Sequence, residues 1–278
     1  MNNPIWLYWE TIKNKPEPAY ITLCKWCFLH QWSDANIIFL NKTNIDAYLP
    51  GISKLVEKIE VDVTGRLDKL KRKLIPQKLN EAVKCDVYRA FILKNYGGIY
   101  LDISAIPMNP IKPFFNLLDS HDFFVTQRQS HQKEHYPVAF YGCTKNSLII
   151  NEYCAQIIAR LKLNNNLHYN ELGHFTLTPI VNKYKKTAQV LPEKTIMPIT
   201  FEEAKKALVS STLTLTEYDL VNILCFKLSN QPFKTVLKNF VLEDLYYSPL
   251  FIGKLFRHSL PETVFKARMN QLKGNFNE

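Results

Sequence analysis

The N-terminal part of the chain alternates between short apolar runs and stretches with helical spacing. Residues 5–9 and 36–40 are short, apolar and rich in β-prone side chains, so each run predicts a strand. Apolar positions at 20, 21, 23, 24, 27 and 28 predict a helix over 20–31, and residues 44–49 predict a shorter one. The order strand, helix, strand, helix predicts an α/β fold with a largely parallel sheet.

The clearest helical pattern lies further along the chain. Apolar residues recur at three- and four-residue spacing from Leu79 to Phe91, and Gly97 and Gly98 end the pattern as a helix C-cap would. Residues 99–102 then predict a strand, which two prolines follow. Further strands are expected at 122–126 and 137–141, and further helices at 146–161 and 261–273.

Composition and charge indicate a globular protein with an anionic partner. Of the 278 residues, 46% are hydrophobic, and the formal net charge is +10. Such a charge suits a phosphorylated substrate, a nucleic acid or an anionic membrane surface. The eight glycines form no G-x-G-x-x-G loop, no P-loop and no G-x-S-x-G turn. A metal ion or cationic side chains would therefore have to hold any bound phosphate.

The start of the sequence, the lengths of its apolar runs and its cysteines predict a cytoplasmic protein. No charged and then apolar leader opens the sequence, and no run approaches the roughly 18 apolar residues that span a membrane. The six cysteines form no dense disulfide framework, which fits a reducing compartment.

The segment 84–104 carries the candidate chemistry. Asp86 and Arg89 are three residues apart, so a carboxylate and a guanidinium share one face of the central helix. Asp102 stands at the end of the following strand, where ligands bind in open α/β sheets. A carboxylate there can hold Mg²⁺ or Mn²⁺, and such an ion could neutralise a diphosphate. A surface ion pair and an Asp at a turn are the alternative that these residues leave open.

The same segment resembles the hallmark of DXD-type sugar transferases, D-x-x-R-x-x-x-L-x-x-x-G-G-[IV]-[YW]-x-D-x-[DST]. The N-terminus resembles the capsular polysaccharide synthesis glycosyltransferases, whose members open with I-W-x-Y-W-E and continue with P-x-Y-I-x-L-C. Here these motifs are residues 5–10 and 18–24. Residues 248–258, SPLFIGKLFRH, are similar to that group's C-terminal S-P-x-x-K-L element.

This resemblance implies a GT-A-type, Rossmann-like nucleotide-sugar-binding fold with additional helices. It implies one glycosyltransferase domain over 1–278, with a donor-binding core at about 1–185 and an acceptor- or membrane-facing region at about 186–278. The implied reaction moves a sugar, with retention of configuration, from a nucleotide sugar to a growing capsular or other surface polysaccharide. A UDP-sugar is the favoured donor, and a glycan or lipid-linked glycan is the acceptor. The alternative is a non-catalytic nucleotide-sugar or carbohydrate-binding protein with a degenerate metal site.

The resemblance also implies roles for particular residues. Asp86, Arg89 and Asp102 are the expected catalytic residues, and Asp102 and Ser104 would hold Mn²⁺ or Mg²⁺. The expected donor-binding residues are Trp9 against the base, and Asp86, Arg89, Gly98, Tyr100, Lys254 and His258. Many relatives have a second Asp where this chain has Ser104, and a hydroxyl is the weaker metal ligand. Lys254 and His258 would then carry more of the diphosphate charge.

Three further motifs have competing interpretations. His131–His135 matches the H-x-x-E-H pattern of zinc proteases, but its surroundings lack an apolar helix face, so we expect a polar loop near the acceptor. Cys24 and Cys27 form a lone C-x-x-C in a helical pattern, which indicates buried core thiols. Residues 173–179 resemble a donor-side loop of DXD transferases, and a turn before a helix is equally open.

Two basic stretches bear on the partners. Residues 66–84 carry no RNA-module signature, so we expect a solvated face and no nucleic acid. Residues 249–258 combine Leu, Phe and Ile with Lys, Arg and His. This mixture predicts peripheral contact with an anionic membrane, on the inner face of the cell membrane.

Overall fold

The chain divides into two units that alternate along the sequence. Unit 1 comprises Met1–Glu10, Asn36–Leu101 and Lys112–Pro192, and unit 2 comprises Thr11–Ala35, Asp102–Ile111 and Glu193–Glu278. The structure is a computed structural model, and it describes residues 3–11, 16–57, 60–62, 78–130, 133–163, 166–168, 170–228, 237 and 240–274.

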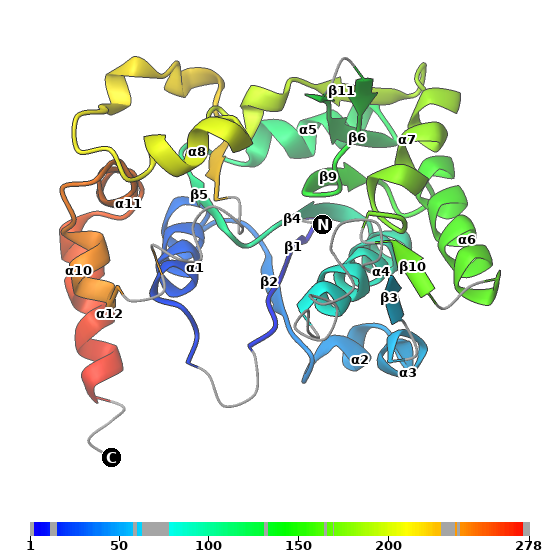
Figure 1. Cartoon of the computed structure of the whole chain (residues 1–278), viewed down its shortest axis with the longest axis horizontal. Coiled ribbons are helices and arrows are strands. Elements are labelled where there is room, and N and C mark those ends of the chain that lie inside the picture. The colour runs from blue at the N-terminus through cyan, green and yellow to red at the C-terminus, as the bar shows by residue number, and fades with distance from the viewer. Residues whose placement is uncertain are drawn as a thin grey trace. The chain divides into compact units, whose positions relative to one another are not determined.

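Unit 1 is built around a six-stranded sheet with the order β11-β6-β9-β4-β1-β2 (Figure 1). Its strands are β1 (Ile5–Tyr8), β2 (Ile37–Leu40), β4 (Gly98–Leu101), β6 (Phe123–Thr126), β9 (Phe140–Cys143) and β11 (Ala188–Leu191). In this sheet β9 runs antiparallel to both of its neighbours, whereas the other neighbouring strands pair in parallel. The predicted α/β class with a largely parallel sheet is therefore confirmed.

Both faces of this sheet are covered, which explains the continuous apolar runs in its strands. Side chains of a strand point alternately to opposite faces. Phe123 and Tyr141 lie in the core cluster that includes the buried side chains of helices α4 (Lys78–Tyr96) and α6 (Leu148–Leu163). Phe124 and Phe140 instead contact Phe114 of α5 (Lys112–Ser120). β4 therefore lies centrally and buried, between β1 and β9.

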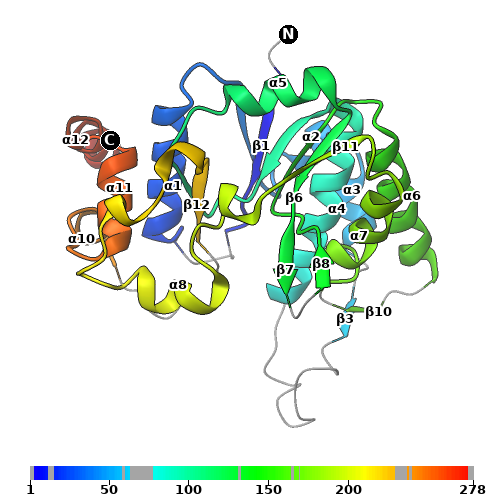
Figure 2. The same cartoon turned by 90° about the horizontal axis from the view of Figure 1, so that it is seen from above.

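The remaining elements of unit 1 are short, apart from one helix. They are α2 (Ile45–Tyr48), α3 (Ile52–Val56), β3 (Glu60–Asp62), β7 (Arg128–Ser130), β8 (Lys133–His135), β10 (Asn166–His168) and α7 (His174–Lys183). The β7–β8 hairpin continues beyond the end of β6 (Figure 2).

Two sequence expectations need correction here. The strand predicted at 137–141 lies at 140–143, because Val138 and Ala139 form a turn. The polar loop predicted at 131–135 is wrong for residues 133–135, which form β8, and residues 131–132 lie outside the described residues. A strand does not bring the two histidines of an H-x-x-E-H motif to one helix face.

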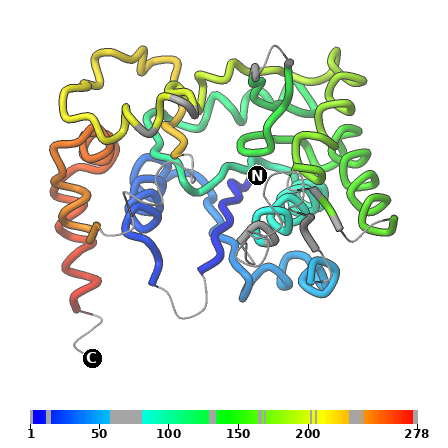
Figure 3. The backbone as a smooth tube through the Cα atoms, viewed as in Figure 1, coloured from blue at the N-terminus to red at the C-terminus, as the bar shows by residue number. Residues whose placement is uncertain are grey.

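Unit 2 brings the N-terminal helix α1 (Ala19–Gln31) together with C-terminal helices. In Figure 3, α1 is blue and lies beside the orange and red helices of this unit. The other elements are η2 (Glu193–Thr195), α8 (Phe201–Ala207), η3 (Leu215–Glu217), η4 (Leu220–Asn222), α10 (Leu242–Tyr246), α11 (Phe251–Ser259), α12 (Glu262–Gly274), and the antiparallel strands β5 (Ala105–Pro107) and β12 (Cys225–Lys227).

The interior of unit 2 confirms one sequence expectation and bears on a second. Cys24 and Cys27 are fully buried on α1, as predicted, and burial raises the pKa of the Cys27 thiol to about 12. The apolar side chains of α11, including Phe251 and Phe256, are also buried. These apolar side chains are therefore buried inside the protein. They do not support the predicted contact with a membrane. Among the described helices, none is long and apolar enough to cross a membrane.

Gly98 provides a test of how β4 is attached to β1. It has φ +94°, and an added Cβ would lie 2.2 Å from the carbonyl oxygen of Pro4, which accepts the Ile99 N–H at 2.9 Å. We expect Gly98→Ala to lower the free energy of unfolding by about 3 kcal/mol or more, measured by urea denaturation. Gly51→Ala is the matched control, because Gly51 has φ +77° and no atom within 4 Å of an added Cβ. It should cost about 1 kcal/mol, and equal losses would contradict the role assigned to Pro4.

Candidate functional site

Asp86 and Arg89 form a buried ion pair on α4. Their exposed fractions are 6% and 7%, and the Arg89 Nη2 lies 3.1 Å from Asp86 Oδ1. The Arg89 Nη1 also donates to the carbonyl of Val138, in the turn before β9. The i,i+3 spacing thus gives the pair that the sequence predicted, but it is buried in the protein and not exposed on the surface.

Tyr100 and Gly173 complete this cluster from two other elements. The Arg89 guanidinium carbon lies 4.9 Å from the centre of the Tyr100 ring, a cation–π distance. The Tyr100 hydroxyl lies 3.2 Å from the Cys85 sulfur. Gly173, which precedes α7, approaches Asp86 so closely that an added Cβ would lie 2.9 Å from Asp86 Oδ2. The 173–179 segment is therefore both the start of a helix and a neighbour of a predicted donor-binding residue.

Trp9 and Gly98 lie at opposite edges of the sheet. Trp9 directly follows β1, and its N–H donates to the Leu40 carbonyl at 3.0 Å, so it stands at the carboxyl edge of the parallel strands. Gly98 is the first residue of β4 and lies at the amino edge, against Pro4. Gly98 and Trp9 thus lie at opposite ends of neighbouring strands, and the role of Gly98 toward a donor stays a prediction. The lack of a side chain at Gly98 also has a structural reason, because an added Cβ would meet Pro4.

Asp102 directly follows the last residue of β4 and is the first residue of a unit 2 segment. Its carboxylate pairs with Lys227 of β12, and the Lys227 Nζ lies 3.0 Å from Asp102 Oδ2. The sequence motif does not predict Lys227, because Lys227 lies 125 positions after Asp102 in the sequence. The signal that could have found it is the alignment of β12 with β5, which the sequence did not reveal.

The predicted metal ligands are oxygen donors. Asp102 offers a carboxylate and Ser104, which is 3% exposed, offers a hydroxyl. Among the residues that the structure describes, no group of three His, Cys, Asp or Glu side chains could hold a metal ion. Mg²⁺ is usually bound through one or two carboxylates together with substrate phosphates, and oxygen ligands suit Mn²⁺ as well. This donor set therefore fits a hard divalent cation whose other ligands come from a substrate.

Lys254 and His258, predicted to meet a diphosphate, lie one turn apart on α11. The Lys254 ammonium donates to the carbonyls of Ser211 and Leu213, at 2.7 and 2.8 Å. It thus holds the 211–213 segment against α11. His258 is exposed in the last turn of the helix. Their role toward a donor stays a prediction.

His174, at the start of α7, lies close to the basic residues His135 and Arg128, a grouping that the sequence did not predict. Its ring lies 4.9 Å from the ring of His135. Burial, together with the smaller effects of the nearby charges of His135 and Arg128, lowers the pKa of His174 to about 4. His174 is therefore neutral at pH 7.

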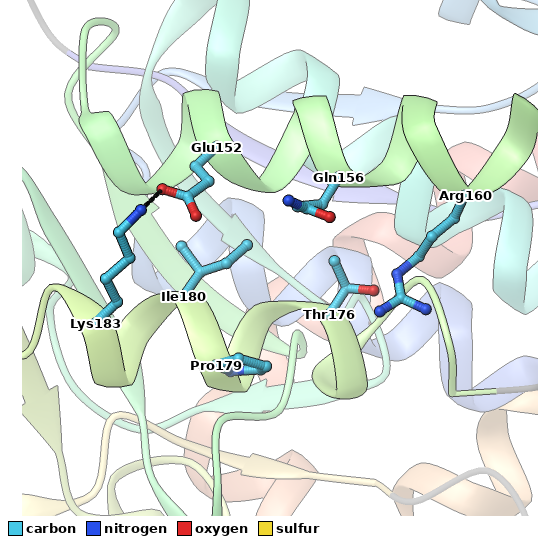
Figure 4. Close-up of a pocket in the computed structure, with 7 residues that line it drawn as sticks. All are labelled: Glu152, Gln156, Arg160, Thr176, Pro179, Ile180 and Lys183. Carbon is cyan, nitrogen blue, oxygen red and sulfur yellow. Dashed lines mark hydrogen bonds and ion pairs between the residues drawn. The ribbon is translucent and has the colours of Figure 1, made fainter.

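A hollow of about 300 Å³ lies between α6 and α7 (Figure 4). Its described lining includes Glu152, Gln156 and Arg160 of α6, and Pro179 and Ile180 of α7. None of the residues predicted to be catalytic, donor-binding or metal-binding lines it, although Pro179 belongs to the 173–179 segment.

With this geometry in place, the comparisons with known proteins can be stated. Residues 19–124 match the family model of the glycosyltransferase sugar-binding region containing DXD motif. This segment holds Asp86, Arg89, Asp102 and Ser104, and it is less than half of the chain. The match supports a glycosyltransferase. None of the curated proteins matches the sequence.

Solved glycosyltransferase structures are similar to the chain at low identity. The PaToxG glycosyltransferase is 16% identical with a TM-score of 0.44, and the match covers 93% of this chain and 86% of that one. GlyE of Streptococcus pneumoniae is 11% identical with a TM-score of 0.48, and the match covers 97% of this chain and 64% of that one. The galactosyltransferase LgtC, solved with donor and acceptor sugar analogues, is 12% identical with a TM-score of 0.44, and the match covers 91% of this chain and 95% of that one. These likenesses are too distant to assign an activity to this chain.

The burial of the Asp86–Arg89 pair predicts a large structural effect of Arg89→Ala. The variant leaves the Asp86 carboxylate buried without its cation and the Val138 carbonyl without its donor. We expect the free energy of unfolding to fall by about 3 kcal/mol, measured by chemical denaturation. Arg160→Ala is the control in the same unit, because Arg160 pairs with Glu171 at 3.0 Å but is 36% exposed. Its loss should stay below about 1 kcal/mol, and a similar loss for both variants would contradict the prediction.

The lowered pKa of His174 predicts a loss of stability in acid. Between about pH 6.5 and pH 4 the unfolded chain takes up a proton at His174 that the folded protein does not. The titration of His174 therefore leaves the free energy of unfolding unchanged above about pH 6.5 and lowers it as the pH falls toward 4. We expect the melting temperature of His174→Asn to fall less between pH 7.5 and pH 4.5 than that of the unaltered protein. Parallel pH curves would show that His174 does not titrate in this way.

Proposed function

We propose that this protein is a GT-A-type glycosyltransferase that uses a nucleotide-sugar donor and a glycan acceptor. The observation that carries the proposal is the match of residues 19–124 to a DXD-containing glycosyltransferase family. That segment contains the Asp86–Arg89 pair on a rigid helix and Asp102 directly after a central strand. Ligands of open α/β sheets bind beyond the carboxyl ends of the strands, where Trp9 and Asp102 follow β1 and β4.

The finer proposal names the substrates and the location. The donor is a UDP-sugar that gives up a hexose, and the acceptor is a growing capsular or other surface polysaccharide, free or lipid-linked. The protein acts in the bacterial cytoplasm or at the inner face of the cell membrane. The similarity of residues 5–10 and 18–24 to capsular glycosyltransferases supports the acceptor class. The net charge of +10 supports an anionic donor and an anionic membrane surface.

We assign a task on the donor to several residues of the motif and to Trp9. Asp86 accepts hydrogen bonds from sugar hydroxyls, and Arg89 fixes the direction of that carboxylate through their 3.1 Å contact. Trp9 contacts the base. Asp102 and Ser104 hold Mn²⁺ or Mg²⁺, which DXD glycosyltransferases generally use. When bound, the cation supplies positive charge that stabilises the departing diphosphate.

The proposed reaction retains the configuration of the transferred sugar. The bond between the anomeric carbon and the diphosphate breaks, and an acceptor hydroxyl forms the new bond on the same face. The hydroxyl proton leaves with the diphosphate. Stabilisation of the leaving group is then the main task of the protein, so no side chain needs to act as a nucleophile.

A donor screen tests the proposal directly. The protein is incubated with nucleotide sugars of different bases, with Mn²⁺, with Mg²⁺ or with a chelator, and released nucleoside diphosphate is measured. Release from UDP-sugars that depends on the divalent ion supports the proposal. Binding of a nucleotide sugar without release supports the non-catalytic alternative, which the Lys227 contact to Asp102 favours. Binding of neither donor nor glycan contradicts both functions.

Asp102→Asn separates catalysis from folding. We expect this variant to lose at least about 100-fold in nucleoside diphosphate release, because Asn removes the charge that holds the cation. Its melting temperature should stay close to that of the unaltered protein, because the Asp102 side chain is 25% exposed. The control is Asp244→Asn on α10, an exposed acid of the same unit, which should keep full activity. Unchanged release by Asp102→Asn would refute the assignment.

A further inference from the structure

Lys227 lies on the carboxylate that the proposed function assigns to a divalent cation. Its Nζ is 3.0 Å from Asp102 Oδ2, and the side chains of the pair are 17% and 25% exposed. Both residues belong to unit 2. The Lys227 ammonium is therefore a charged group next to Asp102, where the proposed function also places a divalent cation and the diphosphate of the donor.

The backbone on both sides of Lys227 fixes the position of its side chain. β12 pairs antiparallel with β5, and Lys227 lies opposite Ala105. The Lys227 N–H donates to the Ile196 carbonyl at 2.8 Å, and the next N–H, of Leu228, donates to the Ser104 carbonyl at 2.7 Å. The ion pair thus follows from the register of two strands. It is not a chance meeting of two long surface side chains.

The charges of this pair differ from those of a site with two carboxylates. Asp102 contributes one negative charge, Ser104 contributes none, and Lys227 contributes one positive charge. The pair is neutral, so it attracts a divalent cation less than two carboxylates would. A cation that approaches Asp102 also meets the positive charge of Lys227. A diphosphate, by contrast, attracts both the ammonium and the cation.

We propose that Lys227 makes cation binding at Asp102 depend on the diphosphate of the donor. Before the donor binds, Lys227 neutralises Asp102 and keeps the affinity for a divalent cation low. When the donor binds, its diphosphate oxygens accept hydrogen bonds from the Lys227 ammonium, and the Asp102 carboxylate becomes available to the cation. Lys227 is then a diphosphate-binding residue outside the sequence motif. This inference rests on the proposed function.

Thermodynamic linkage gives the proposal a measurable form. If the diphosphate raises the affinity for the cation by some factor, the cation raises the affinity for the diphosphate by the same factor. Lys227 strengthens this coupling, because cation and ammonium compete for Asp102 only while no diphosphate is bound. Removal of the ammonium should therefore tighten the binding of the cation alone and weaken the binding of the diphosphate alone.

The experiment uses the full chain and two probes that need no knowledge of the base or the sugar. Mn²⁺ alone is titrated by electron paramagnetic resonance, and inorganic pyrophosphate alone is titrated by calorimetry in the presence of a chelator. We expect Lys227→Gln to bind Mn²⁺ about tenfold more tightly than the unaltered protein, and pyrophosphate about tenfold more weakly. Lys227→Met is a second uncharged variant, which keeps an unbranched apolar side chain like the stem of lysine, should Lys227→Gln not fold.

Matched variants separate this proposal from a general effect of charge. Lys227→Arg keeps the positive charge and should behave like the unaltered protein toward Mn²⁺. Lys273→Gln removes a lysine of the same unit whose Nζ pairs with Glu243 at 2.9 Å, and it should change neither affinity. If Lys227→Gln and Lys273→Gln gain Mn²⁺ affinity equally, the gain comes from the lower net charge and not from the position of Lys227. That result would overturn the proposal. Unchanged Mn²⁺ affinity in Lys227→Gln and Lys227→Met would overturn it as well.

The double variant Asp102→Asn, Lys227→Gln distinguishes this inference from the proposed function. If Asp102 is the ligand, the double variant loses the Mn²⁺ affinity that Lys227→Gln gained. If the double variant binds Mn²⁺ as tightly as Lys227→Gln does, Asp102 is not the ligand, and the metal assignment of the proposed function is wrong. If Asp102→Asn weakens Mn²⁺ binding but neither uncharged Lys227 variant changes it, only the role of Lys227 is wrong.

Discussion

The buried guanidinium of Arg89 is the interaction on which the arrangement of unit 1 depends. It joins helix α4 to the turn before β9 through Val138, to β4 through the ring of Tyr100, and to Asp86 on its own helix. A buried charge persists only when its partners satisfy it, so these three elements keep one relative position. The direction of the Asp86 carboxylate is a product of that packing, and any chemistry of Asp86 depends on it.

The order of the strands in the sheet explains why Trp9 and Asp102 follow neighbouring strands. β4 lies between β1 and β9 in the centre of unit 1, and Trp9 and Asp102 directly follow β1 and β4. Neighbouring parallel strands end at the same edge of a sheet, which is where ligands of open α/β sheets bind. At the other edge, Gly98 has no side chain, and Pro4 occupies the space. β4 thus packs against Pro4 at its amino end, and the predicted metal ligand Asp102 follows its carboxyl end.

The sequence predicted what is local and missed what depends on distant pairing. The α/β class, the helix with Asp86 and Arg89 on one face, and Asp102 at a strand end all follow from spacing within about twenty residues. The position of β9 was displaced because a turn at Val138 interrupts an apolar run that periodicity cannot divide. Lys227 was missed because its place beside Asp102 comes from the register of β5 and β12. Burial of the Asp86–Arg89 pair was equally invisible, since it depends on which elements cover α4.

The alternation of the two units along the sequence has a consequence for how this protein can be made and changed. The chain passes from one unit to the other five times, after residues 10, 35, 101, 111 and 192. Neither unit is therefore a continuous stretch of polypeptide, and a single cut of the gene cannot yield one of them whole. Folding must close long loops before either core is complete, which slows it relative to a chain of successive domains.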